Sequence, residues 1–289
     1  MDSAVHNRRT VVVAAREHEL DSVLARRRIS AHLTEFDLIP WESWDERADP
    51  SAALICDDVD AAAKASGMGV PVVFVRSGHE VDGPGFADFG VHCRHWPGWL
   101  PDPAKRAGAP QATGVLAPVR LRQGRSPSLA VILLAVSALP RDEVVEFTGC
   151  VLRPLLDEIS LPRIVVFDDH PSAIEEGLPG ADLRQVCDTD VDALHADAAL
   201  FVAAPTLTAV GLAQARRSAL AFLPPLDRTQ KDLLDLLRVV ISVPVLGERG
   251  FAAVEPTVPN WSDLDPALDD LRGAQRVARQ VRQLTLAPM

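Results

Sequence analysis

Short apolar runs alternate with amphipathic stretches along the whole chain. In the first half the runs cover residues 10–15, 52–58, 69–77 and 113–121, and helical patterns cover 17–33 and 59–66. Runs this short and this rich in β-branched residues predict strands buried on both faces of a parallel sheet. Residues 78–110 are rich in Gly, Pro, His and Trp, and we expect irregular structure there.

The second half repeats this pattern. We expect strands over 129–138, 163–169, 183–188 and 198–204, and helices over 143–159, 191–196, 230–239 and 266–284. Between the halves, the sequence RQGRSPS at 122–128 is typical of an interdomain linker. The pattern therefore predicts an α/β fold with two Rossmann-like domains, at 1–121 and 129–289.

Composition limits the possible partners. The chain has 289 residues, of which 47% are hydrophobic, and a formal net charge of −11. This charge repels nucleic acids and anionic lipids, so we expect neither as a partner. The N-terminus lacks the apolar segment of a signal peptide, no run is long enough for a membrane span, and the four cysteines are widely spaced. We therefore expect a cytoplasmic protein with no bound metal.

The residues 198–230 carry the most informative pattern. FVAAPTLTAV has the order of a strand and a turn with two threonines, LAFLPP that of a second strand, and DRTQ that of an acid/amide pair. This order resembles the donor domain of GT-B glycosyltransferases, such as the lipid-II-forming N-acetylglucosaminyltransferase and antibiotic glycosyltransferases. In the first half, ALICDDVDAAAKASGMGVPVVFV and TGVLAPVRL are similar to segments of their N-terminal domain. In size and general character the chain most resembles the cytosylglucuronic acid synthase-related proteins.

The resemblance implies a substrate and a set of residues. The donor would be a nucleotide sugar, most simply a UDP-sugar, bound as substrate with no further cofactor. Its diphosphate would lie at a helix N-terminus beside Thr206 and Thr208, and Asp227 and Gln230 would bind sugar hydroxyls. The two Rossmann-like domains would face each other, and the last helix would pack back on the N-terminal domain. A simpler interpretation is that Thr206 and Thr208 cap one helix and that Asp227 caps the next.

The chain also departs from the family pattern. Gly211 and Leu212 stand where a ribose-binding glutamate is usual, and the residues 217–219 replace a Gly-x-Pro joint. The loops AAREHEL and AVSALPRDE lack the glycines that let a backbone approach a phosphate. Arg216 and Arg217 would offset part of this loss by pairing with the diphosphate. We therefore expect that the chain retains the GT-B-like fold and that its donor site is altered.

Sugar transfer also needs a base near the acceptor. His18 follows the first strand and Asp57 follows the second, so these are the candidate catalytic residues. Asp58 also follows the second strand, but it is equally well explained by a role as the N-cap of the next helix.

Two other polar groups are candidates for binding. His79, His92 and His95, with Trp96 and Trp99, would offer a surface on which an aromatic acceptor stacks. The sequence DDH at 168–170 also ends a strand. These residues would either cap the loop that follows or bind a metal.

Three functions remain open at this point. The first is transfer of a sugar from a nucleotide sugar to a small acceptor, such as the nucleobase cytosine in nucleoside-antibiotic synthesis. The second is a catalytically degenerate homologue that binds a nucleotide or acts as the auxiliary partner of another glycosyltransferase. The third is a two-domain binding protein of unrelated ancestry.

Overall fold

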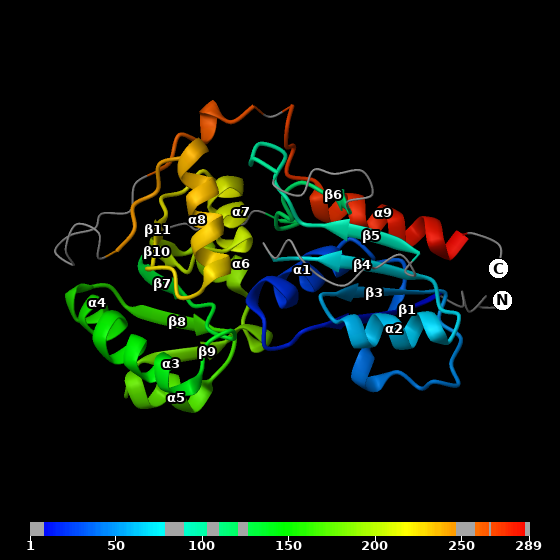
Figure 1. Ribbon diagram of the computed structural model, residues 1–289, viewed down its shortest axis with the longest axis horizontal. Coiled ribbons are helices and arrows are strands. Elements are labelled where there is room, and N and C mark those ends of the chain that lie inside the picture. The colour runs from blue at the N-terminus through cyan, green and yellow to red at the C-terminus, as the bar shows by residue number, and fades with distance from the viewer. Residues whose placement is uncertain are drawn as a thin grey trace, which may run out of the picture.

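The computed structural model describes residues 9–78, 90–102, 110–120, 127–246, 258–265 and 267–286. They form two parallel β-sheets, each flanked by helices, that lie side by side (Figure 1). The predicted α/β class with two facing Rossmann-like domains is confirmed. We call the first sheet with its helices the N-domain and the second the C-domain. Among the described residues, no helix has the length and apolar character needed to cross a membrane.

The N-domain is built on a six-stranded sheet in the order β2-β1-β3-β4-β5-β6. Its strands are β1 (Thr10–Ala15), β2 (Asp37–Pro40), β3 (Ala52–Cys56), β4 (Val72–Arg76), β5 (Val91–Arg94) and β6 (Gln111–Ala112). Helix α2 (Val59–Gly67) packs on one face, and α1 (Leu20–Ser30) and α9 (Gly273–Leu286) pack on the other. The last helix of the chain therefore lies on the first domain, as the GT-B plan implies (Figure 1).

The C-domain has a five-stranded sheet in the order β11-β10-β7-β8-β9. Its strands are β7 (Leu129–Leu133), β8 (Arg163–Phe167), β9 (Asp182–Gln185), β10 (Ala198–Ala203) and β11 (Ala221–Phe222). Helices α3 (Arg141–Phe147), α4 (Arg153–Glu158) and α5 (Pro171–Gly177) pack on one face. Helices α6 (Val191–Ala196), α7 (Leu207–Arg216) and α8 (Arg228–Val240) pack on the other, toward the N-domain.

Two sequence predictions in the first half are wrong. In the run at 113–121, the described residues 113–120 form no strand, because Gly114 has a φ of 81° and makes only an isolated bridge with Trp96. The backbone N–H of Val115 donates instead to the Asp269 side chain, which removes it from any ladder. The stretch expected to be irregular contains β5, whose pairing with β4 is parallel. Most of the expected linker lies outside the described residues.

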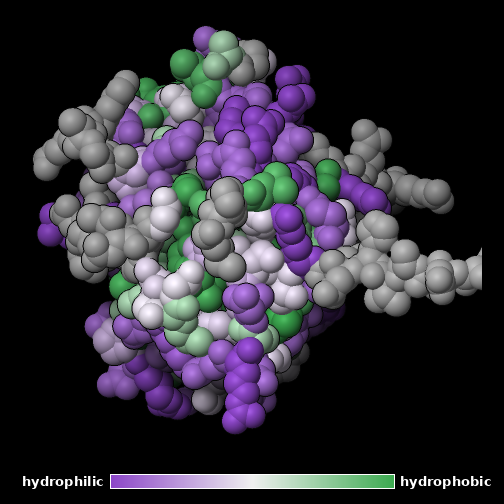
Figure 2. All heavy atoms as spheres, turned by 90° about the vertical axis from the view of Figure 1, so that its right-hand side faces the viewer, coloured by the Kyte–Doolittle hydropathy of each residue, from purple (hydrophilic) through white to green (hydrophobic). Residues whose placement is uncertain are grey.

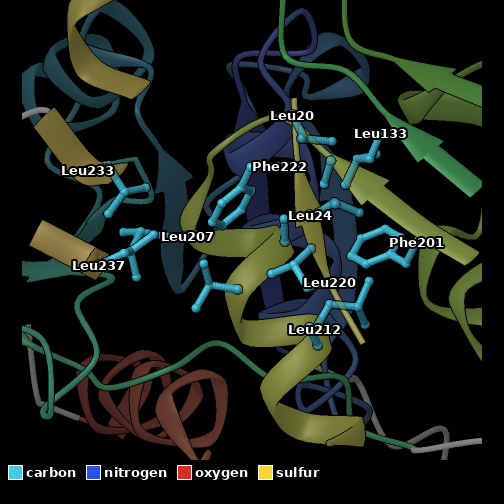
Figure 3. Close-up of a cluster of buried hydrophobic side chains, with 14 of the residues drawn as sticks. Leu20, Leu24, Leu133, Phe201, Leu207, Leu212, Leu220, Phe222, Leu233 and Leu237 are labelled. Atoms are coloured by element: carbon cyan, nitrogen blue, oxygen red, sulfur yellow. The ribbon is translucent and has the colours of Figure 1, made fainter. Parts of the chain in front are cut away.

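Helix α1 joins the two domains because it is apolar on two sides. Ala25 and Ile29 pack into the core beneath the N-domain sheet. Leu20, Val23 and Leu24 belong instead to a cluster with residues of the C-domain. Figure 3 shows Leu20 and Leu24 within this cluster, among labelled side chains of β7, β10, α7 and α8. This cluster is therefore a core that helix α1 shares with the C-domain, and it is distinct from the core beneath the N-domain sheet.

Polar contacts reinforce this shared core. The buried Arg28 donates from Nη2 to Asp192 Oδ1 at 2.6 Å and from Nη1 to the Leu116 carbonyl at 2.8 Å. The Trp99 indole N–H donates to Gln214 Oε1 in α7 at 3.2 Å. By contrast, hydrophilic side chains cover much of the outer face of the molecule in Figure 2, with smaller apolar areas between them. The domains are thus held by apolar packing and by directed hydrogen bonds.

Candidate functional site

A cavity of about 440 Å³ lies where the carboxyl ends of the two sheets meet. It takes its polar wall from the residues that follow the strands and begin the helices of both domains. In open α/β sheets, ligands bind outside the carboxyl ends of the strands, and a volume of this order holds a small molecule. The polar and charged lining residues are Arg16, Glu19, Asp21, Asp57, Arg76, Ser77, Ser137, Asp168, Thr206, Asp227, Thr229 and Gln230.

Asp57 lies at the N-domain wall of the cavity. It follows β3 directly and has a φ of 58°, a left-handed conformation in which the chain turns sharply out of the strand. Its Oδ1 accepts from the Ser77 backbone N–H at 2.9 Å, and its Oδ2 accepts from the Ser77 hydroxyl. The candidate catalytic carboxylate is therefore fixed by the end of the neighbouring strand β4.

Asp21 and Asp168 connect the two domains across the cavity. Asp21, in the first turn of α1, accepts from the Thr208 backbone N–H of α7 at 3.1 Å. Asp168, which follows β8, accepts from the Leu20 backbone N–H of α1 at 3.4 Å and from the Val136 N–H at 2.8 Å. Each carboxylate thus satisfies a backbone donor at the N-terminus of a helix in the other domain.

The three carboxyl groups all have a raised pKa. Burial raises the pKa of Asp21, Asp57 and Asp168 to about 6. Repulsion from Asp57 adds to the raised pKa of Asp21, whereas the hydrogen bonds from Thr208 oppose it. A carboxylate with a pKa near neutrality is a stronger base than an ordinary one and still ionises at pH 7. The cavity wall can therefore accept a proton.

The donor-binding candidates serve as helix caps. Thr206 is the N-cap of α7, and its hydroxyl accepts from the Ala209 N–H at 3.2 Å. Asp227 is the N-cap of α8 and accepts from the Gln230 N–H at 2.7 Å. Gln230 donates from Nε2 to the Ala135 carbonyl at 2.8 Å. Thr206, Asp227 and Gln230 line the cavity, and Thr208 lies beside it, bonded to Asp21.

Other candidates lie outside the cavity. His18 is exposed in the turn before α1 and is not among the lining residues. Arg216 and Arg217 end α7, at the far end from its N-terminus, and Arg216 donates to the Asp192 carbonyl at 3.0 Å. Ten helical residues separate the two ends by about 15 Å, so the cavity and these arginines occupy different places. Asp58 is the N-cap of α2.

His95, Trp96 and Trp99 are part of the core, whereas His92 is half-buried. Burial lowers the pKa of His95 to about 3, and its ring lies between the Ser77 carbonyl and the Leu116 N–H. Trp96 and Trp99 are 1% and 7% exposed, so they offer no open surface for stacking. The predicted aromatic binding surface is therefore wrong for these residues. His79 lies outside the described residues.

Sequence reasoning missed the role of two residues. Asp168 was interpreted only as a loop cap or a metal ligand at the end of a strand, and Asp21 was not singled out. A strand-terminal carboxylate is a usable signal, since the carboxyl edge of the sheet is where ligands bind. Asp21 had no comparable signal, because an acidic residue in the first turn of a helix is common for reasons of helix stability alone.

The fold and the cavity together define a class. This is a two-domain α/β protein with a ligand-sized cavity between the carboxyl ends of two parallel sheets, the arrangement expected for a GT-B-like protein. The chain belongs to the family of CGA synthase-related proteins, whose model matches residues 11–289. The expected resemblance to this family is thereby confirmed. No curated protein matches the chain.

Solved glycosyltransferases are distantly similar to the chain. MurG of Acinetobacter baumannii is 12% identical over 95% of this chain and 99% of its own, with a TM-score of 0.48. The glycosyltransferase SnogD of Streptomyces nogalater is 15% identical over 96% and 94%, with a TM-score of 0.46. The spinosyn rhamnosyltransferase SpnG is 13% identical over 96% and 95%, with a TM-score of 0.49.

Proposed function

We propose that the chain binds a nucleotide sugar and a small acceptor in the interdomain cavity and transfers the sugar between them. The observation that carries this proposal is Asp57, a fixed carboxylate with a pKa of about 6 on the wall of that cavity. The family name, CGA synthase-related, supports a nucleobase such as cytosine as the acceptor. The proposal makes the N-domain the acceptor side and the C-domain the donor side.

The reaction assigns one role to each wall. Asp57 accepts the proton from the attacking N–H or O–H of the acceptor, so that the acceptor atom bonds to the anomeric carbon of the sugar. The bond between that carbon and the diphosphate breaks, and the nucleoside diphosphate leaves with the electron pair. The N-terminus of α7 offers partial positive charge to the leaving diphosphate, and the Thr206 hydroxyl lies at the same end.

A second function is favoured by a specific contact. The Asp21 carboxylate already accepts from the Thr208 N–H at the α7 N-terminus, and Asp227 and Gln230 are bonded within the C-domain. A donor diphosphate must therefore displace a carboxylate of the other domain. If it cannot, the chain is a degenerate homologue that works as a binding or auxiliary partner of another glycosyltransferase.

Two measurements separate these functions. Calorimetric titration with UDP-glucose, UDP-glucuronic acid, dTDP-sugars and GDP-sugars tests donor binding. Mass spectrometry of mixtures with cytosine tests transfer. We expect Asp57→Asn to lower turnover by about 10²- to 10⁴-fold without a matching loss of donor affinity, because only proton transfer is removed.

The adjacent Asp58→Asn variant is the matched control for this experiment. Asp58 caps α2 through the Ala61 N–H, does not line the cavity, and is replaced by an equally good capping residue. Turnover should therefore be unchanged in Asp58→Asn. Donor binding without any product would favour the auxiliary function, and binding of no donor at all would contradict the transfer proposal.

A further inference from the structure

The contacts of Asp21 and Asp168 form a reciprocal pair. The N-domain carboxylate lies at the N-terminus of α7, and the C-domain carboxylate lies at the N-terminus of α1. Helix α1 needs this partner, because the side chain of its N-cap residue Glu19 makes no capping hydrogen bond. Both contacts line or border the cavity, so both must change when the domains separate there.

We propose that Asp21 and Asp168 form an interdomain latch that closes the cavity and that ionisation of the two carboxylates weakens this latch. The inference goes beyond sugar transfer and does not depend on it. Closure shields Asp168 almost wholly and Asp21 in part from water, whereas separation of the domains exposes both carboxylates to it. A charged carboxylate is favoured in water, and a neutral one is favoured in the closed interface.

The surrounding charges do not neutralise the pair. Asp57 at the end of β3 repels the Asp21 carboxylate, whereas Arg28, which lies on α1 with Asp21, attracts it. Beside it, Arg16 is paired with Glu19 at 2.8 Å. Asp168 accepts hydrogen bonds from the backbone N–H groups of Val136, Leu20 and Asp169 and from the side chain of Ser137, none of which is charged. The remaining charged residues of the cavity wall are Arg76 after β4 and Asp227 at α8.

The direction of the effect follows from linkage. The closed state binds a proton more tightly than the open state, because burial raises the pKa of both groups from 3.8 to about 6. Closure is therefore most favoured below pH 4 and is progressively lost as the pH rises through 6. From pH 5 to pH 8, each carboxylate should shift the ratio of open to closed molecules by about tenfold.

Hydrogen–deuterium exchange of the full chain tests the latch directly. The amides of Leu20 and Thr208 are the donors in the two contacts, and the amide of Ala61, capped by Asp58 within one domain, is the internal reference. After correction for intrinsic exchange, protection of Leu20 and Thr208 should fall by about 100-fold between pH 5 and pH 8, while that of Ala61 should not.

Variants then test whether the two carboxylates cause the pH dependence of protection. The double variant Asp21→Asn with Asp168→Asn keeps an acceptor oxygen at each helix but removes the charge, so its protection should no longer depend on pH. Asp58→Asn should keep the wild-type profile. Equal normalised protection of Thr208 at both pH values in the wild type would overturn the proposal, even if the double variant failed to fold. A wild-type pH profile in the folded double variant would overturn it as well.

Discussion

Asp57 illustrates at the scale of one residue how a candidate base costs stability. Its raised pKa means that the folded protein binds the proton more tightly than the unfolded chain does. The stability that this group contributes is therefore fully present below pH 4 and is lost as the pH rises through 6. An ionised group in such a place destabilises the fold, as expected of the base that we propose.

Replacement of Asp57 by asparagine should therefore stabilise the fold. We expect the free energy of unfolding at pH 8 to rise by on the order of 1 kcal/mol, because the neutral amide avoids the cost of a buried charge. The gain should be smaller at pH 5, where the folded wild type is mostly protonated at this position. Urea denaturation at the two pH values measures both effects. A loss of stability at pH 8 would show that the hydrogen bonds from Ser77 outweigh the burial of the charge.

At the scale of elements, α1 is fixed to α6 by a buried ion pair. The Arg28 side chain is 1% exposed, and Asp192 holds it through both Nε and Nη2. Removal of one partner from such a pair leaves an uncompensated buried charge. We expect Asp192→Ala to lower the free energy of unfolding by about 3 kcal/mol, measured by chemical denaturation.

The pair Arg184–Asp182 provides the control for Asp192→Ala. Its side chains are 42% and 46% exposed, so Asp182→Ala should cost less than about 1 kcal/mol. Similar losses in the two variants would mean that the pair Arg28–Asp192 stabilises the fold no more than a surface ion pair does.

Helix α9 begins against the backbone of the N-domain. A Cβ atom at Gly273 would lie 2.6 Å from the carbonyl oxygens of Gly114 and Val115, which are backbone atoms that cannot rotate away. We therefore expect Gly273→Ala to destabilise the fold by about 1 to 3 kcal/mol and to lower its Tm. Gly149→Ala is the matched control, since its Cβ would meet no atom within 4 Å. Equal Tm values for the two variants would show that α9 can shift without cost.

Elements whose signal is local could be predicted, and elements defined by distant contacts could not. The strand Thr10–Ala15 was predicted with its observed bounds, because its five buried positions after Thr10 are all apolar. The apolar run at 113–121 failed because its Val115 N–H bonds to Asp269, more than 150 residues later. The predicted helix at 143–159 is divided by a π-helical turn at Thr148–Leu152. Asp57 could be predicted as a strand-end carboxylate, but the pairing of Asp21 with α7 required the fold.

At the scale of the whole molecule, the closed cavity and the donor compete. Helix α1 packs in the core of the N-domain and in the cluster on the C-domain sheet, and Asp21 carries a negative charge of the N-domain to the N-terminus of α7, where we propose that the diphosphate binds. A bound diphosphate would gain the helix N-terminus only by displacing that carboxylate, and the two negative groups would repel each other. The energy of donor binding is thus reduced by the cost of breaking an interdomain contact.

This competition predicts the strength of donor binding. We expect UDP to bind the wild type with a Kd near millimolar, and Asp21→Asn to bind it about ten- to a hundredfold more tightly, because the neutral amide does not repel the diphosphate. Calorimetric titration at pH 7 measures both constants, and Asp58→Asn should match the wild type. Micromolar binding by the wild type, or equal constants for wild type and Asp21→Asn, would show that the diphosphate binds away from Thr208.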